Sequence, residues 1–192
     1  AGGADKESDE SYRERIHEAP ESFSDAGSYG AYAFFAKSAN PDIADVFITS
    51  PSPGEVKIVP LMTGGEIPEE EVLKDVLEAC NAEKVRPLTD HVTAEAPTKV
   101  DYEIEASYFI NADDRSQAAA IQKAVGEAVE AYKTWQSAKL GRDLDPSKLY
   151  ELMVKAGARK VTVTKPALTK LTGTQVAAAG EAKITYKGAE DE

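Results

Sequence analysis

Cysteine, tryptophan and histidine are scarce in this chain of 192 residues, which has one Cys, one Trp and two His. The single Cys80 excludes an internal disulfide framework, because a disulfide needs two cysteines. Cys80 also falls on the apolar stripe of a predicted helix, so we expect a buried, inert thiol. His17 and His91 lie in unrelated segments without a second His or Cys nearby. Neither fits the three or four clustered ligands of a zinc site.

Long apolar runs and basic patches are missing as well. The apolar stretches stay well below the roughly 18–20 residues that a membrane span needs. The chain has 22 Lys+Arg against 34 Asp+Glu, a net charge of −12 at pH 7. A surface of that sign repels phosphate backbones and anionic lipids. We therefore expect no nucleic-acid partner and no membrane partner.

Motifs that carry chemistry are also absent. The glycines follow neither a phosphate-binding loop nor a nucleophile elbow. The sequence Asp143-x-Asp145-x-Ser147 starts like a calcium loop. Lys148, however, stands where that loop needs Gly, and Val154 stands where it needs the bidentate Glu. We expect no catalytic residue, no metal site, no cofactor and no small-molecule substrate.

The sequence between the two polar ends divides at Pro97 into two α+β patterns. In the first, β-branched runs flank a Pro-Ser-Pro-Gly turn, which is typical of a hairpin. Glu69–Glu71 complement the positive end of the dipole of a helix that follows Pro68. The predicted elements are a helix over 29–38, strands over 46–49 and 56–59, a helix over 68–81 and a strand over 91–96.

The second pattern begins with strict alternation of apolar and polar residues over 102–110, which predicts a half-buried strand. Asp113-Asp114 with Gln117 suggest a capping box for a long helix to about Ala138. Asp145, Pro146 and Gly157 mark the start and end of a second helix. Strands are predicted over 160–164 and 182–186, antiparallel to each other.

These patterns predict an α+β fold with two tandem small α/β sandwich domains and mainly antiparallel sheets. The boundaries we expect are an N-terminal extension with a short helix over 1–27, a central α+β domain over 28–97, a C-terminal α+β domain over 98–188 and a disordered tail over 189–192.

Three stretches carry a resemblance to a known family. They are Gly3–Ile16 with 30–32 and 44–46, Ser50–Val56 with Asn81–Val92, and Leu140–Leu149 with Ala156–Val161. Their residue sequences and their order along the chain resemble the baseplate assembly protein J family of contractile-tailed phages, as in the P2-like group. The match covers about residues 2–188, and Arg86-Pro87-Leu88-Thr89-Asp90 is its most specific piece.

The resemblance implies a structural wedge subunit of the baseplate in a contractile phage tail or phage-tail-like particle. Such a subunit mediates baseplate assembly and has no enzyme activity. Its implied partners are other baseplate wedge proteins, with a second copy of the chain left open. Its implied location is the virion tail baseplate, and the host cytoplasm during assembly. Full-length relatives carry a further region that would precede Ala1.

Two questions stay open at this point. In the run from Arg86 to Asp90, Pro87 can simply rigidify a turn while Asp90 pairs with Arg86 or with the local backbone. Alternatively, Arg86, Pro87, Leu88 and Asp90 form a subunit contact. At the level of function, the alternative is a small-molecule-binding regulatory α+β module without enzymatic activity, because unrelated functions share this kind of fold.

Overall fold

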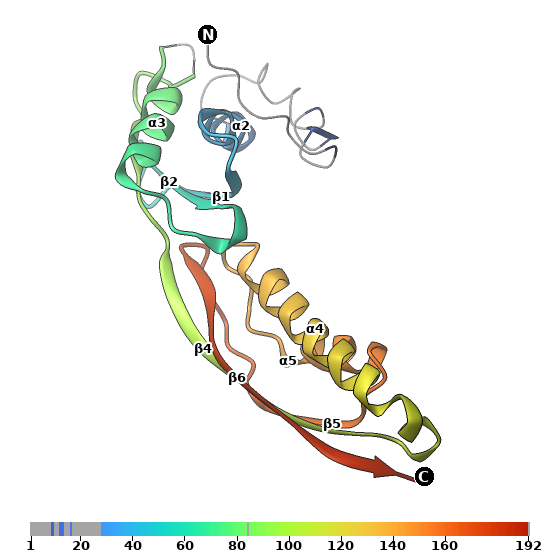
Figure 1. Ribbon diagram of the computed structural model, residues 1–192. Coiled ribbons are helices and arrows are strands. Elements are labelled where there is room, and N and C mark those ends of the chain that lie inside the picture. The colour runs from blue at the N-terminus through green and yellow to red at the C-terminus, as the bar shows by residue number, and fades with distance from the viewer. Residues whose placement is uncertain (1–8, 10–11, 14–15, 17–27, 84, 192) are drawn as a thin grey trace. The chain divides into compact units, whose positions relative to one another are not determined.

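The computed structural model describes residues 9, 12, 13, 16, 28–83 and 85–191. The chain divides into two compact units, Ala1–Pro97 and Thr98–Glu192. Each unit combines helices with one three-stranded sheet, so the predicted α+β class is confirmed (Figure 1). The short helix predicted within the N-terminal extension over 1–27 lies largely outside the described residues.

The first unit follows the predicted order of helix, strand, strand, helix and strand. Its helix α2 is capped by Ser28, whose Oγ accepts a hydrogen bond from Ala31 N at 3.1 Å. The helix α3 begins two residues after Pro68, with Glu69 at its N-cap. The elements are α2 (Tyr29–Ala39), β1 (Ile43–Thr49), β2 (Glu55–Met62), the 3-10 turn η2 (Thr63–Gly65), α3 (Glu70–Asn81) and β3 (His91–Ala94).

The sheet of this unit has the order β1-β2-β3 and is mixed. β1 runs antiparallel to β2, whereas β2 runs parallel to β3. The expectation of mainly antiparallel sheets is therefore wrong here. α3 carries the chain from the end of β2 back to its start, so β3 enters in the direction of β2. The core includes Tyr32, Ala36, Ile58, Val76, Cys80 and Val92.

The second unit also keeps its predicted order of strand, helix, helix, strand and strand. Asp145 caps α5 as expected, since its Oδ1 accepts from Ser147 N at 2.8 Å. Gly157 follows α5 with a φ of 98°. The elements are β4 (Thr98–Asn111), the 3-10 helix η3 (Ala112–Gln117), α4 (Ala118–Ser137), α5 (Pro146–Lys155), β5 (Arg159–Lys165) and β6 (Gln175–Glu190).

The predicted capping box at Asp113-Asp114 is wrong. Both aspartates lie inside η3, which Asn111 caps through its side chain. α4 starts only at Ala118, and its N-cap Gln117 makes no side-chain capping bond. A tighter 3-10 turn therefore precedes the α-helix and takes up the residues that the box would have used.

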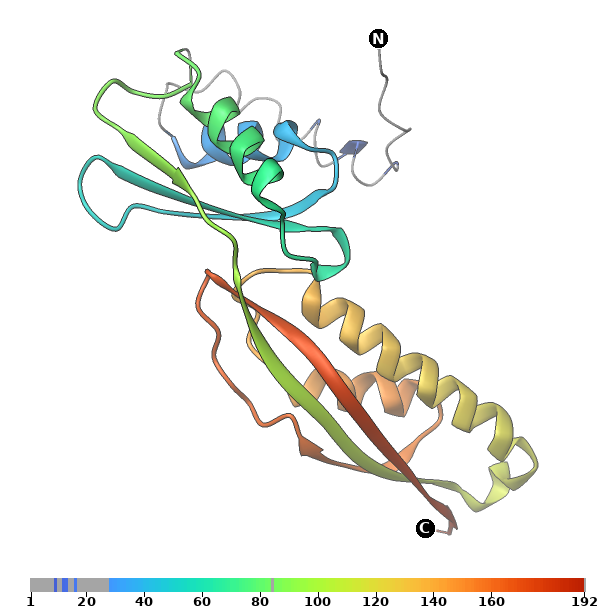
Figure 2. The same ribbon diagram turned by 60° about the vertical axis from the view of Figure 1, so that its left-hand side comes forward.

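The sheet of the second unit has the order β5-β4-β6, with β4 antiparallel to β5 and parallel to β6 (Figure 2). The predicted antiparallel pairing of the last two strands is wrong. After β5 the chain runs back to the start of β4, where Thr98 N donates to Thr174 O at 2.9 Å. β6 therefore enters on the other edge of β4 and in the same direction as β4.

β6 also extends further than predicted at both ends. Ala189 and Glu190 pair with the last residues of β4, and Glu190 contacts Lys160 Nζ at 2.7 Å. These two residues belong to a strand and not to a disordered tail. The expectation failed because the pairing partner, rather than local β-propensity, holds this end of the chain.

α4 and α5 pack over one face of the β5-β4-β6 sheet (Figure 1). α4 turns an apolar face to the sheet, since Val125, Val129 and Tyr132 are buried. One buried member of that face is polar, Gln136. The core includes Ile104, Tyr108, Ile110, Tyr132, Leu149 and Met153.

Candidate subunit-contact loop

The run that carries the most specific resemblance forms a tight turn between α3 and β3. Asp90 N donates to Pro87 O at 3.1 Å, which closes a four-residue β-turn. Leu88 and Thr89 occupy its two central positions. Leu88 is 95% exposed, the highest value among the exposed large apolar side chains of the described residues. The turn therefore presents a leucine to solvent at its tip.

Two side chains hold the ends of this turn together. The guanidinium of Arg86 donates through Nη1 to the backbone carbonyl of Asp90 at 2.5 Å. The carboxylate of Asp90 accepts from the Tyr32 hydroxyl at 3.0 Å, and Tyr32 itself is 1% exposed. Burial, followed by this hydrogen bond to Asp90, raises the pKa of Tyr32 above its ordinary value. The buried phenol thus fixes the loop to α2.

The hairpin turn between β1 and β2 supports the same loop from another side. Gly54 O accepts from His91 N at 2.6 Å. Gly54 has a φ of 80°, and a Cβ at this position would lie 3.1 Å from Thr89 O. A glycine is needed here on both counts, because a side chain would be strained and would push the loop away.

Of the four candidate residues, three form hydrogen bonds that hold the turn in shape, and the fourth, Leu88, is exposed at its tip. Arg86 and Asp90 do interact, but through the backbone carbonyl of Asp90 rather than as an ion pair between their side chains. Pro87 is half-buried and accepts the hydrogen bond that closes the turn. Sequence reasoning missed Tyr32 and Gly54, which are far away in the chain and show no local signal for this role. The subunit contact itself stays a prediction.

Another stretch of the resemblance, Leu140–Leu149, is hydrogen-bonded to the segment between β5 and β6 and to the start of β6. Gly141 N donates to Gln175 O at 2.8 Å, and Leu171 N donates to Asp143 Oδ1 at 3.0 Å. The buried Gln136 donates from Nε2 to the carbonyls of Arg142 and Asp143 at 3.0 and 3.2 Å. This motif therefore has a structural explanation inside the second unit.

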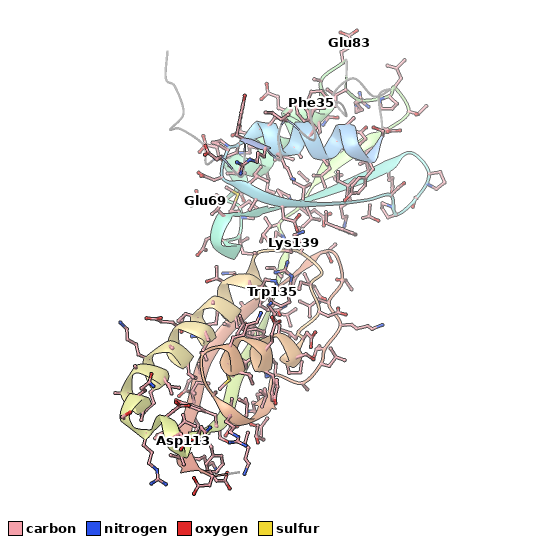
Figure 3. All side chains as sticks on the ribbon, turned by 90° about the vertical axis from the view of Figure 1, so that its right-hand side faces the viewer. Phe35, Glu69, Glu83, Asp113, Trp135 and Lys139 are labelled. Carbon is pink, nitrogen blue, oxygen red and sulfur yellow. The ribbon has the colours of Figure 1, made fainter. Side chains whose placement is uncertain are left out.

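Trp135 lies toward the C-terminal end of α4, next to Arg142 of the Leu140–Leu149 stretch (Figure 3). The guanidinium carbon of Arg142 lies 4.1 Å from the centre of a Trp135 ring, within cation–π range. Trp135 packs partly buried against the core. Its contacts are thus accounted for within the unit.

Groups with known reactive chemistry are few in the described part of the chain. Cys80 is free and buried, and burial raises the pKa of its thiol to about 12. Among residues 28–83 and 85–191, we find no cluster of three or more His, Cys, Asp or Glu that could hold a metal ion. His91 is exposed, and His17 lies outside the described residues. None of the described helices is long and apolar enough to cross a bilayer.

The chain is thus a protein of two consecutive α+β units, the first of which carries a surface loop held by hydrogen bonds. Two family models match consecutive parts of the chain, the Baseplate J-like central domain over residues 24–96 and the Baseplate J-like protein C-terminal domain over residues 102–185. The chain belongs to the Baseplate J-like family.

One curated relative and one solved structure are similar to this chain. It is 36% identical over 187 residues to "Baseplate protein J" of Escherichia phage P2, covering 96% of this chain and 61% of that protein. The chain thus spans about three fifths of the length of this relative. Its fold is similar to a chain in the cryo-EM structure of the anti-feeding prophage (AFP) baseplate, with a TM-score of 0.57 and 14% identity. That match covers 93% of this chain and 43% of the other.

Proposed function

We propose that this chain is a structural component of the baseplate of a contractile phage tail or phage-tail-like particle, where it acts as a wedge subunit that mediates assembly. The observation that carries the proposal is the 36% identity to the phage P2 baseplate protein J over nearly the whole chain. The two Baseplate J-like domains in consecutive order support it. The role is non-enzymatic and its partners are other baseplate proteins, with assembly in the host cytoplasm.

The Arg86–Asp90 loop is the surface we assign to a contact with a neighbouring subunit. A leucine that is 95% exposed contributes nothing to the core of its own domain. Its burial in an apolar socket of a partner would remove that surface from water. The loop is also fixed before binding by Arg86, Tyr32 and Gly54, so little conformational entropy is lost when a partner docks.

The test is co-sedimentation with tail particles from the induced source strain, in the context of the full-length gene product. Mass spectrometry of pelleted particles should find this protein in fixed ratio to sheath and tube proteins. If particles form and the protein stays wholly in the soluble fraction, the baseplate role is wrong. In that case the regulatory ligand-binding module becomes the leading alternative.

The loop contact is tested separately with a matched pair of variants. Leu88→Asp should reduce incorporation into particles without reducing folding, because Leu88 makes no core contact. The control is Tyr29→Asp, which changes another exposed apolar residue of the same unit, 60% exposed. Asp suits the first turn of α2, so this variant should fold and incorporate normally. Equal incorporation of both variants would refute the contact while leaving the baseplate role intact.

A further inference from the structure

β4 lacks a neighbour along part of one edge. β6 pairs with β4 over its whole length, but β5 pairs with it only from Glu105 to Phe109. Over Val100–Ile104, no described strand pairs on the β5 side, and no main-chain hydrogen bond from the link over 166–174 reaches this segment. Unpaired main-chain groups on a strand edge are a template for another strand. We call this segment, Val100–Ile104, the β4 notch.

The sequence itself keeps β5 from closing the notch. β5 ends at Lys165 and is followed by Pro166, which has no N–H to donate to a sheet ladder. The chain then leaves the sheet, and Thr169 exchanges two main-chain hydrogen bonds with Leu144, at 2.9 and 3.2 Å. The edge of β4 beyond the end of β5 is therefore left without a paired strand among the described residues.

A groove of about 570 Å³ lies at the notch. β4 runs beside β6 here, and the two strands can be followed together in Figure 2. The apolar lining residues of the groove are Val100, Leu144 and Pro166, of which Val100 is half-buried and the other two are buried. Its charged lining residues are Asp101, Glu103, Lys165 and Glu181.

These charges leave the groove with an unbalanced negative sign. Glu103 and Lys165 neutralise each other in an ion pair of 2.7 Å. Asp101 and Glu181 are exposed and form no ion pair with any residue in the described part of the chain. Asp101 lies on β4 itself and Glu181 lies on β6, on the other side of β4 from the open edge, and both line the groove. Two carboxylates in the groove favour a partner strand with long basic side chains, since complementary charge selects the partner and its register.

The free edge of β6 differs from the notch in ways that discourage pairing. It carries Lys183 and Lys187 and contains Gly188 with a φ of 112°, and charged residues and bulges are common protections of edge strands. In the notch, Lys165 is paired with Glu103 at 2.7 Å, and on β6 Lys183 is likewise paired with Glu105 at 3.8 Å. Both edges carry charged residues, so the feature that distinguishes the β6 edge is the backbone irregularity at Gly188.

We propose that the β4 notch binds an extended segment of a partner polypeptide, which adds a short strand beside Val100–Ile104 and places Lys or Arg side chains against Asp101 and Glu181. The main-chain groups of β4 provide the pairing, and the two carboxylates provide the preference for a basic segment. This proposal does not depend on the baseplate role or on the Arg86–Asp90 loop.

The test uses this chain of 192 residues and three nine-residue peptides of defined sequence. The probe alternates Lys and Val, the charge control replaces each Lys by Glu, and the pairing control keeps the Lys residues but has Pro at its centre. Amide chemical shifts and hydrogen exchange are followed by NMR. We expect the Lys-Val peptide to shift and protect amides of residues 100–104, with little effect of either control.

Variants of the two carboxylates locate the binding. Asp101→Asn and Glu181→Gln should each weaken binding of the Lys-Val peptide by about 2- to 5-fold, as expected for exposed ion pairs. Asp113→Asn, a change at another exposed acid of the same unit, should leave the affinity unchanged.

Non-specific attraction is the competing outcome, because residues 1–97 hold 20 Asp+Glu against 8 Lys+Arg while residues 98–192 hold 14 of each. Shifts that concentrate in residues 1–97, or equal binding of the Pro-containing peptide, would overturn the proposal. So would the absence of any shift at millimolar peptide.

Discussion

Two glycines of the second unit should respond in opposite directions to the same substitution. Gly157 has a φ of 98°, in a region that L-residues rarely adopt, and a Cβ there would lie 3.3 Å from both Cγ1 and Cγ2 of Ile121. Gly126 lies inside α4, and a Cβ there would meet no atom within 4 Å. Gly157→Ala should therefore destabilise the unit, whereas Gly126→Ala should stabilise it.

The magnitudes follow from backbone energetics. A left-handed conformation costs an L-residue about 1–2 kcal/mol, and the crowding against Ile121 adds to this cost. The restriction of the unfolded chain by Ala returns about 0.4–1 kcal/mol. We expect a net loss of about 1–2 kcal/mol for Gly157→Ala. For Gly126→Ala we expect a gain of about 0.5–1 kcal/mol, the cost of Gly in a helix interior.

The assay is urea unfolding followed by Trp135 fluorescence, which reports on the second unit because Trp135 is the only tryptophan. With a slope of about 2 kcal/mol per molar urea, the two midpoints should separate by roughly 1 M. Gly157→Asn should be milder than Gly157→Ala if strain dominates, since Asn tolerates positive φ better. An unchanged midpoint for Gly157→Ala, alongside the expected rise for Gly126→Ala, would refute the reasoning.

Three further predictions concern the buried polar and ionisable groups. Tyr32→Phe should cost about 1 kcal/mol of unfolding free energy by removing the hydrogen bond to Asp90, with thiol exposure of Cys80 in urea as the readout for the first unit; an unchanged midpoint would mean that the bond is not formed in solution. The Cys80 thiol, whose pKa burial raises to about 12, should not react with a disulfide reagent at pH 8 until the unit unfolds, and rapid labelling of the folded protein would contradict its burial. Burial raises the pKa of Tyr132 to about 12, so its neutral phenol stabilises the fold fully below pH 10, and this contribution is lost as the pH rises toward 12. Circular dichroism should show unfolding in that range. In Tyr132→Phe, the loss of stability between pH 8 and pH 12 should be smaller than in the unchanged protein.

The order of the elements could be predicted from the sequence because the signals for single elements are local. The alternation over 102–110 and the helical stripe of α4 both depend on neighbours within a few residues. Strand pairing has no such signal, since it depends on where the chain returns after β5. The alanine-rich start of β6, Ala177–Ala179, has no β-branched residue and was missed as a strand. It is held in place by its pairing with β4.

The candidate loop shows the same division between local and distant information. Its turn could be predicted from Pro87 and Asp90, but the hydrogen bond from Tyr32 joins residues 58 positions apart in sequence. Likewise, Gln136 occupies a buried position on an apolar stripe because two loop carbonyls need a donor there. A polar residue of this kind cannot be placed before the loop that it satisfies is known.

The structure separates the residues of the Arg86–Asp90 run by what they do within their own domain. Arg86, Pro87 and Asp90 each form a hydrogen bond that shapes the turn, and Thr89 contacts Asp90 Oδ1 through its hydroxyl at 3.3 Å. A structural explanation is therefore available for four of the five positions. It fails for Leu88, because a side chain that is 95% exposed gains nothing from folding and presents apolar surface to water. If the run has a role outside its own domain, that role rests on Leu88, and the other four residues act by holding it in place.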